Sequence, residues 1–180
     1  MKGKGKPEPA WTPIFNAKLH VSRNAGKHPA NRMPSAKRML TAHIKIAGVK
    51  AYVLFDGGAE TDAISLDYIQ AVHIPILQLE NPVLLQMGTK GTRSQIIYKM
   101  NVDIEINSHI QTHYFDVVNI NKYDVILGAP WLNENKALLD FESYVVKTQG
   151  KGSIKTLTFD EDQVTKSHGW KTRAKAQMAP

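Results

Sequence analysis

The chain has 180 residues, of which 42% are hydrophobic, so it is long enough for one ordinary domain with tails. It contains no cysteine, which excludes disulfide frameworks, cysteine zinc sites and thiol nucleophiles, and which favours an intracellular, cytoplasmic location. The net charge is +7, no apolar run is long enough for a transmembrane helix, and no apolar stretch follows the basic start as it would in a secretory signal.

The positive charge is concentrated in residues 1–40, which carry nine Lys or Arg residues against the single acidic residue Glu8. This segment is rich in Lys, Pro, Asn and Ala and lacks a steady apolar period, so we predict a basic disordered leader. Two interpretations stay open: a solvated polyprotein remnant, or an arm that contacts nucleic acid weakly through phosphates. No aromatic–basic pattern indicates a specific nucleic-acid module, and no membrane contact is expected.

From Thr41 onward the pattern changes to short strands separated by glycine turns. The predicted strand segments are a hairpin around Gly48 (41–56), a second hairpin over 83–98, single strands at 100–106 and 110–120, a buried strand from 123, and a last hairpin over 138–159. Short helices are expected over 63–74 and from about Pro130. Many strands with little helix predict an all-β barrel or sandwich over 41–159, followed by a polar C-terminal tail over 160–180.

The stretch "AYVLFDGGAETDAIS" (51–65) carries the chemistry. An apolar strand ends at Asp56, and the next residues are Gly57, Gly58 and Ala59. The two glycines expose backbone N–H groups around the Asp56 carboxylate. A carboxylate that accepts such bonds stays in place and can stay charged despite partial burial. Asp56 is therefore the candidate catalytic residue. The alternative is that Asp56 caps a turn and that the glycines serve only backbone geometry.

One aspartate is half of an acid–base pair, because two carboxylates that share a proton can activate a water molecule between them. Asp-Gly-Gly-Ala occurs once in the sequence. A two-fold dimer would supply the second Asp56, since such an interface repeats the same loop on both sides of the axis. A homodimer is therefore expected, with no cofactor.

Three stretches in this order give the chain a family resemblance over about residues 40–160. "VLFDGGAETDAIS" resembles the catalytic loop of the retropepsin-like aspartic protease domain of Ty3/gypsy-type retrotransposon polyproteins. "LLQMGTKGTRSQIIY" resembles its flap hairpin, with Lys90, Gly91 and Thr92 near the tip, and "YDVILGAPWL" resembles its apolar-apolar-Gly motif and following helix. The resemblance implies a closed β-barrel with one lobe per chain, a homodimer, and hydrolysis of a peptide or polyprotein substrate.

The chain departs from that family at Gly57, where the family has Ser or Thr. The resemblance implies that this hydroxyl binds the partner's loop across the dimer axis. Its loss would cost on the order of 1 kcal/mol for each bond. The water chemistry does not need the hydroxyl, so weaker dimerisation is expected. The alternative function is a noncatalytic dimerisation or peptide-binding module.

Other candidate residues are weighed in the same way. Gly128 is expected to be structural, because it allows the strand and the catalytic loop to approach closely. Lys90, Gly91 and Thr92 would close over substrate, or would be an ordinary solvated hairpin tip. His109 and His113 stand four apart in a predicted strand, which separates them by about 13 Å, so no metal site is expected.

Overall fold

The computed structural model describes residues 38–86, 93–120 and 122–167. The strands of this part are β1 Thr41–Ile46, β2 Val49–Phe55, β3 Ala63–Ser65, β4 Leu77–Gln86, β5 Arg93–Ile106, β6 His109–Val118, β7 Val125–Leu127, β8 Leu138–Asp140, β9 Val145–Thr148 and β10 Gly152–Lys155. The helices are α1 Leu66–Val72, α2 Ala129–Glu134 and α3 Phe159–Ser167. None of these described helices has the length and hydropathy of a membrane span.

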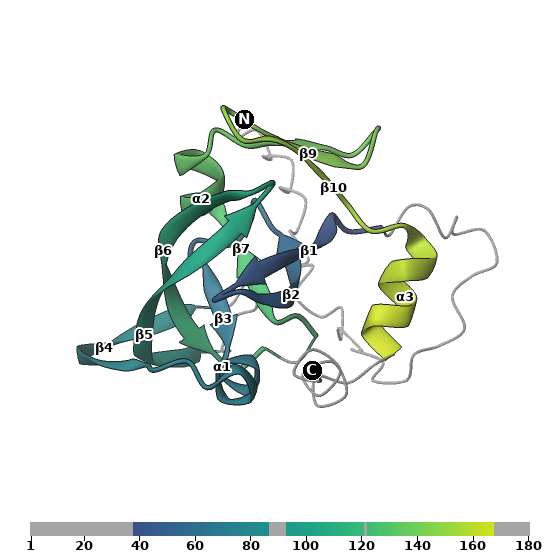
Figure 1. The fold of residues 1–180 in the computed structure, drawn as a ribbon. Coiled ribbons are helices and arrows are strands. Elements are labelled where there is room, and N and C mark those ends of the chain that lie inside the picture. The colour runs from purple at the N-terminus through teal and green to yellow at the C-terminus, as the bar shows by residue number, and fades with distance from the viewer. Residues whose placement is uncertain (1–37, 87–92, 121, 168–180) are drawn as a thin grey trace, which may run out of the picture. The chain divides into compact units, whose positions relative to one another are not determined.

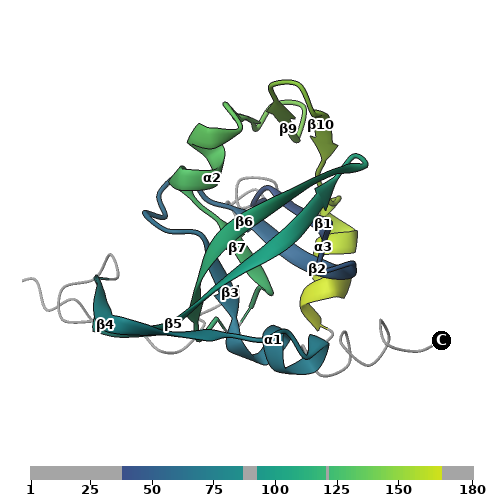
Figure 2. The same ribbon diagram turned by 60° about the vertical axis from the view of Figure 1, so that its left-hand side comes forward.

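Six strands form a closed mixed barrel in the order β1-β2-β7-β3-β6-β5, and pairing of β1 with β5 closes the ring. The pairs β2–β7 and β3–β6 are parallel, whereas the other neighbouring strands of the ring are antiparallel. β4 pairs with β5 outside the ring, and Figures 1 and 2 show these two strands running side by side. The prediction of an all-β fold with a closed barrel is confirmed.

The first predicted hairpin joins β1 to β2 through Ala47 and Gly48. Both residues have positive φ, 52° and 78°, and Ile46 pairs directly with Val49. Positive φ at both central residues is typical of the two-residue turn whose twist matches that of the flanking strands. This hairpin directs β2 through the core, and β2 ends one residue before Asp56.

The core explains why β2 reads as a continuous apolar run. Residues 51–55 are all buried, because Ala51, Val53 and Phe55 face the barrel core while Tyr52 on the other face is covered by Tyr123 and Asp162. The Phe55 ring packs on Trp131 from α2 with ring centroids 5.8 Å apart. Trp131 is fully buried and Leu132 is nearly so, as expected of core residues.

β8, β9 and β10 form a separate antiparallel sheet. The β9–β10 turn contains Gly150 and Gly152, which both have positive φ. The Lys151 ammonium in this turn donates to Asn135 Oδ1 at 2.5 Å, and the Asn107 side-chain amide donates to Lys151 O at 2.9 Å. These bonds attach the hairpin to the turn between β5 and β6 and to the end of α2.

The sequence predicts a polar tail over 160–180, and this prediction is wrong for the first part of that segment, where residues 159–167 form helix α3. Thr158 caps the helix: the Glu161 N–H donates to Thr158 Oγ1 at 3.3 Å, and the Thr158 N–H donates to Glu161 Oε2 at 2.7 Å. This reciprocal pair is a capping box. Asp162 is only 3% exposed and accepts hydrogen bonds from Thr41 and Tyr52. A buried carboxylate rather than an apolar stripe holds α3 in place, so apolar periodicity misses the helix.

The N-terminal boundary of the folded part also differs from the prediction. Nearly all of the predicted leader, residues 1–40, lies outside the described residues, but Leu40 is fully buried and accepts the Phe55 N–H at 3.0 Å. The folded part therefore begins before Thr41. A single apolar residue at the end of a basic segment gives no periodic signal, which is why the sequence places the boundary later.

Candidate active site

Asp56 lies directly after β2, where the barrel strands β2 and β7 end together. Phe55 pairs with Leu127, and the Asp56 N–H donates to Leu127 O at 3.0 Å. The side chain is half-buried, and its Oδ1 accepts the Gly58 N–H at 2.9 Å. The Ala59 N–H donates to Asp56 O at 3.2 Å, which closes a tight turn. The backbone thus fixes this carboxylate while it faces a cavity.

The two glycines of this loop have different surroundings. A Cβ at Gly58 would lie 3.3 Å from Asp56 Oδ1, so a side chain there would crowd the carboxylate. A Cβ at Gly57 would meet Leu139 Cδ1 at 3.7 Å and Leu132 Cδ1 at 3.9 Å, which are ordinary van der Waals distances. The structure therefore has room for a side chain at Gly57, and φ there is not in the left-handed region.

Gly128 lies between β7 and α2 and packs against the same loop. A Cβ at this residue would lie 2.4 Å from Thr61 O and 2.7 Å from Ala59 O, so any side chain would collide with backbone. The Ala129 N–H donates to Ala59 O at 2.8 Å. This close approach lets the loop and the start of α2 lie in direct contact.

A cavity of about 610 Å³ opens in front of Asp56. The loop forms one wall, and the other walls come from the ends of β4 and β6, the segment after β6, and β7. The lining residues are Asp56, Gly58, Ala59, Glu60, Thr61, Ala63, Leu85, Val118, Asn119, Ile120, Lys122, Tyr123 and Ile126. A partly buried carboxylate in a cavity lined by apolar side chains with a few polar ones is typical of a site that binds a ligand and acts on it.

Tyr123 lines this cavity and packs against Tyr52 of β2. Its ring lies 5.2 Å from that of Tyr52, measured between centroids. Burial is the main cause that raises the pKa of Tyr123, and the carboxylates of Asp162 and Asp56 raise it further while Lys166 opposes them. The phenol is therefore neutral at ordinary pH and presents an O–H group rather than an anion to the cavity.

Asp62 is a site residue that the sequence does not single out. It is 3% exposed, its Oδ1 accepts the Gly128 N–H at 2.6 Å, and its Oδ2 lies 2.7 Å from His113 Nε2. His113 Nδ1 lies 3.3 Å from Glu134 Oε2. These partners are 51 and 66 residues away along the chain, so no local spacing predicts them.

The loop is also attached to β6 through Asp116. The Thr61 hydroxyl donates to Asp116 Oδ2, the Tyr114 hydroxyl donates to Oδ1 at 2.8 Å, and the Asp116 N–H donates to Asp62 O at 3.0 Å. Burial and then the bond to Asp116 raise the pKa of Tyr114 to about 12. β6 therefore fixes the end of the loop, as β7 fixes its start.

The remaining candidates give mixed results. Lys90, Gly91 and Thr92, the predicted flap tip, lie outside the described residues, although β4 and β5 on either side form the predicted hairpin arms. His109 is exposed and its ring contacts Asn107 O, whereas His113 is buried. Within the part of the chain that the structure describes, no three His, Asp or Glu side chains are arranged to hold a metal ion.

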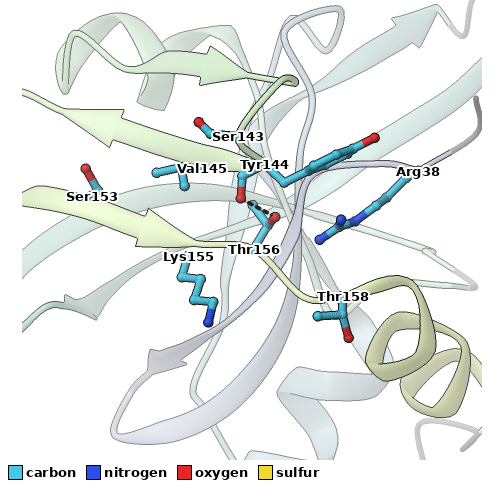
Figure 3. A pocket seen from close by; sticks show the side chains of 8 residues that line it. All are labelled: Arg38, Ser143, Tyr144, Val145, Ser153, Lys155, Thr156 and Thr158. Carbon is cyan, nitrogen blue, oxygen red and sulfur yellow. Dashed lines mark hydrogen bonds between the residues drawn. The ribbon is translucent and has the colours of Figure 1, made fainter. Parts of the chain in front are cut away.

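A second cavity of about 340 Å³ lies between the β9–β10 sheet and the chain that leads into α3 (Figure 3). The Arg38 guanidinium lies 3.8 Å from the centre of the Tyr144 ring and donates to Leu157 O at 2.5 Å. Thr156 Oγ1 donates to Tyr144 O at 2.6 Å. The described residues that line this cavity include no carboxylate, so the acid–base chemistry expected of Asp56 belongs to the first cavity.

Comparison with known proteins adds to this geometry. A sequence model of the PEG10/RTL1 protease domain matches residues 52–156. The retroviral protease-like domain of Ddi1 from Leishmania major superimposes with a TM-score of 0.54 at 12% identity, over 69% of this chain and 97% of that one. EIAV protease complexed with the inhibitor HBY-793 superimposes with a TM-score of 0.41 at 20% identity, over 61% of this chain and 99% of that one. No curated protein matches the sequence. The likeness to the Ddi1 domain shows a shared fold.

Proposed function

The chain belongs to the PEG10/RTL1 protease domain family, as the resemblance to Ty3/gypsy-type protease domains predicts, and we propose that it is an aspartic endopeptidase of retroelement origin that acts as a homodimer. The observation that carries the proposal is the position of Asp56. Its carboxylate is held by the Gly58 amide at the wall of a cavity of about 610 Å³. Gly128 packs directly against the same loop, where a Cβ would collide with Thr61 O and Ala59 O.

Each chain supplies one such carboxylate, since Asp-Gly-Gly-Ala occurs once in the sequence. A two-fold axis beside the loop would bring two copies of Asp56 together and double the cavity into a cleft. Gly57 and Gly58 are exposed in the single chain, so the loop is free to face a second copy.

The proposed reaction is hydrolysis of a peptide bond by water held between the two carboxylates. One Asp56 is ionised and removes a proton from the water as its oxygen attacks the peptide carbonyl carbon, and the protonated Asp56 donates to the carbonyl oxygen. The tetrahedral gem-diol then collapses: the Asp56 that is now ionised takes a proton from one of its hydroxyls, the Asp56 that took the water proton donates it to the leaving nitrogen, and the C–N bond breaks, which restores the singly ionised pair. Because the working form is the singly ionised pair, an acidic optimum is expected.

The cavity walls suit an extended peptide with apolar side chains next to the cleaved bond. Leu85, Val118, Ile120 and Ile126 line them. An extended substrate would bind by adding a strand, with main-chain bonds for affinity and wall contacts for selectivity.

Gly57 supports the second candidate function, a noncatalytic dimerisation or peptide-binding module. It lacks the hydroxyl that the family carries at this position, and the structure has room for one. Sedimentation at several concentrations discriminates between the two functions, because a strict monomer cannot assemble the pair of carboxylates.

The proposal is tested with purified protein and a library of unstructured peptides at acidic pH. We expect cleavage that pepstatin, a hydroxyl-bearing transition-state mimic, inhibits, and that Asp56→Ala abolishes. Asp103→Ala is the matched control, because Asp103 is an exposed aspartate on β5 whose carboxylate, among the described side-chain hydrogen bonds, accepts only the Thr112 hydroxyl. Equal cleavage by Asp56→Ala and the parent protein would show that the assignment is wrong.

A further inference from the structure

A buried polar cluster lies behind the candidate catalytic loop and joins three elements. Asp62 comes from the end of the loop, His113 from β6 and Glu134 from α2. Asp62 and His113 are 3% and 8% exposed, whereas the Glu134 side chain is 61% exposed. The cluster therefore runs from the interior to the surface, with His113 in the middle.

The two carboxylates give the His113 ring a possible partner at each nitrogen. An ionised carboxylate only accepts hydrogen bonds, and a neutral imidazole has one donor nitrogen and one acceptor nitrogen. Both ring nitrogens of His113 face carboxylates, at 2.7 Å from Asp62 Oδ2 and 3.3 Å from Glu134 Oε2. Only the imidazolium ion can donate toward both. A buried ionised Asp62 also favours a cation beside it, since an unpaired buried charge is costly.

Among the residues that the structure describes, no ion pair to the His113 ring is formed by any other group. The charged groups that face it in the described ion pairs are Asp62 from the loop and Glu134 from α2. Phe115 on the same strand contacts the ring edge-on with centroids 5.2 Å apart, and Val102 is its partner residue on β5. The ring is thus held by two carboxylates and an aromatic wall.

Asp62 connects the His113 ring to the backbone of the candidate active site. Its other oxygen accepts the Gly128 N–H at 2.6 Å, and Gly128 packs so closely on the loop that a Cβ there would collide with Thr61 O and Ala59 O. Ala59 is three residues from Asp56 and belongs to the turn that holds it. A change in the Asp62 contact therefore shifts the same backbone that positions the Asp56 carboxylate.

We propose that Asp62 and His113 are positioning residues for the Asp56 loop, and that protonation of His113 tightens the loop by joining it to α2 through Glu134. The catalytic consequence rests on the proposed function, whereas the coupling between His113 and Gly128 does not. Histidine changes charge between about pH 5 and 8, so the coupling falls in a range where it can be measured.

The first test uses the parent protein alone and does not depend on activity. Nuclear magnetic resonance follows the Gly128 amide and the His113 ring protons from about pH 5 to 8. We expect the Gly128 amide shift to change with the same midpoint as His113 and not with that of His109, the exposed histidine on the same strand. A Gly128 amide chemical shift that does not change with the same midpoint as the His113 ring protons would overturn the proposal.

The second test is Asp62→Asn. The amide oxygen can still accept from Gly128 and the amide nitrogen can donate to a neutral His113, so the shape is kept and the charge pair is lost. We expect kcat to fall roughly ten- to a hundredfold with little change in KM, and the His113-dependent limb of the pH profile to disappear. His109→Gln is the matched control and should keep the parental profile.

The two tests separate the inference from the proposed function. Cleavage by the parent protein with an unchanged kcat and pH profile in Asp62→Asn would overturn the positioning role. If the parent protein does not cleave at all, the proposed function fails, and the Gly128 titration alone then decides whether the coupling exists.

Discussion

The Asp56 loop and helix α3 are each anchored to the barrel by one buried aspartate, but the two anchors have different partners. Asp62 binds the Gly128 amide and the His113 ring, whereas Asp162 accepts from Thr41 and Tyr52 and pairs with Lys166 at 2.5 Å. The partner of Asp62 is a histidine, a side chain type that changes charge between about pH 5 and 8, whereas the partner of Asp162 is a lysine, a type that keeps its charge there. The loop anchor can therefore respond to pH in a range where the helix anchor does not.

The pKa of Asp162 supports this difference. Burial opposes its ionisation, but hydrogen bonds from Lys166, Tyr52 and Thr41 outweigh burial and hold the pKa below its usual value. A carboxyl with a lowered pKa in the folded state stabilises fully above its unfolded pKa, about 4, and loses that contribution as pH falls through the folded value. An acidic assay near pH 5 would leave α3 attached.

The comparison predicts that changes in the loop alter activity and that changes in α3 alter stability.

The largest expected effect is on activity. Asp56→Asn should lower the cleavage rate by about 10²–10⁴-fold, because the pair loses its general base or acid. Its free energy of unfolding should change little, since the half-buried carboxylate accepts one described hydrogen bond, from Gly58. Thermal melts and peptide cleavage are measured on the same preparation, and a large loss of stability would break the comparison.

Asp162→Asn should destabilise the fold by about 2 kcal/mol, because the charge that pairs with Lys166 is lost inside the protein. The cost is below that of a fully buried pair, since the Lys166 side chain is 30% exposed. Urea unfolding at neutral pH measures it, and cleavage per folded molecule should stay near the parental value.

The same variant tests the sign of the pH dependence. The stability difference between the parent protein and Asp162→Asn should be constant above about pH 4 and should shrink as pH falls further. A difference that grows toward acid would contradict the lowered pKa of Asp162.

Gly57→Ser tests whether a hydroxyl in the Asp56 loop strengthens the dimer. The new Cβ fits at ordinary distances from Leu139 and Leu132, so the fold should tolerate it. If the hydroxyl bonds across the dimer axis, two symmetric bonds of about 1 kcal/mol each should lower the dimer Kd roughly thirtyfold. Gly57→Ala is the control for backbone stiffening alone, and an equal gain in Gly57→Ala in sedimentation would remove the hydroxyl from the explanation.

Thr158→Ala should give the smallest effect, a loss of about 1 kcal/mol, because it removes the cap of α3. Helix α3 keeps Asp162, so the site should keep its activity. Thr112→Ala removes an exposed hydroxyl that donates to Asp103 and is the control. A loss of cleavage in Thr158→Ala without a loss of stability would show that α3 acts on the site directly.

The two regions also differ in how far the sequence predicts them. The loop is visible because an apolar strand, an aspartate and two glycines are adjacent in the chain, and Gly128 follows a second apolar strand that pairs with the first. The Asp62–His113 contact is not visible, because it joins residues brought together only by the pairing of β3 with β6. Helix α3 is missed because "DEDQVTKS" is polar, and its anchor, Asp162, finds its partners on β1 and β2.

The central claim is that one active site needs Asp56 from both chains, and subunit mixing tests it most directly. Parent and Asp56→Asn chains are mixed at fixed total concentration, allowed to exchange, and assayed for peptide cleavage. If both carboxylates are required, an equal mixture should show about a quarter of the parental activity, because only parent homodimers are active. An equal mixture that keeps about half of the activity would show that each chain acts alone and would contradict the claim.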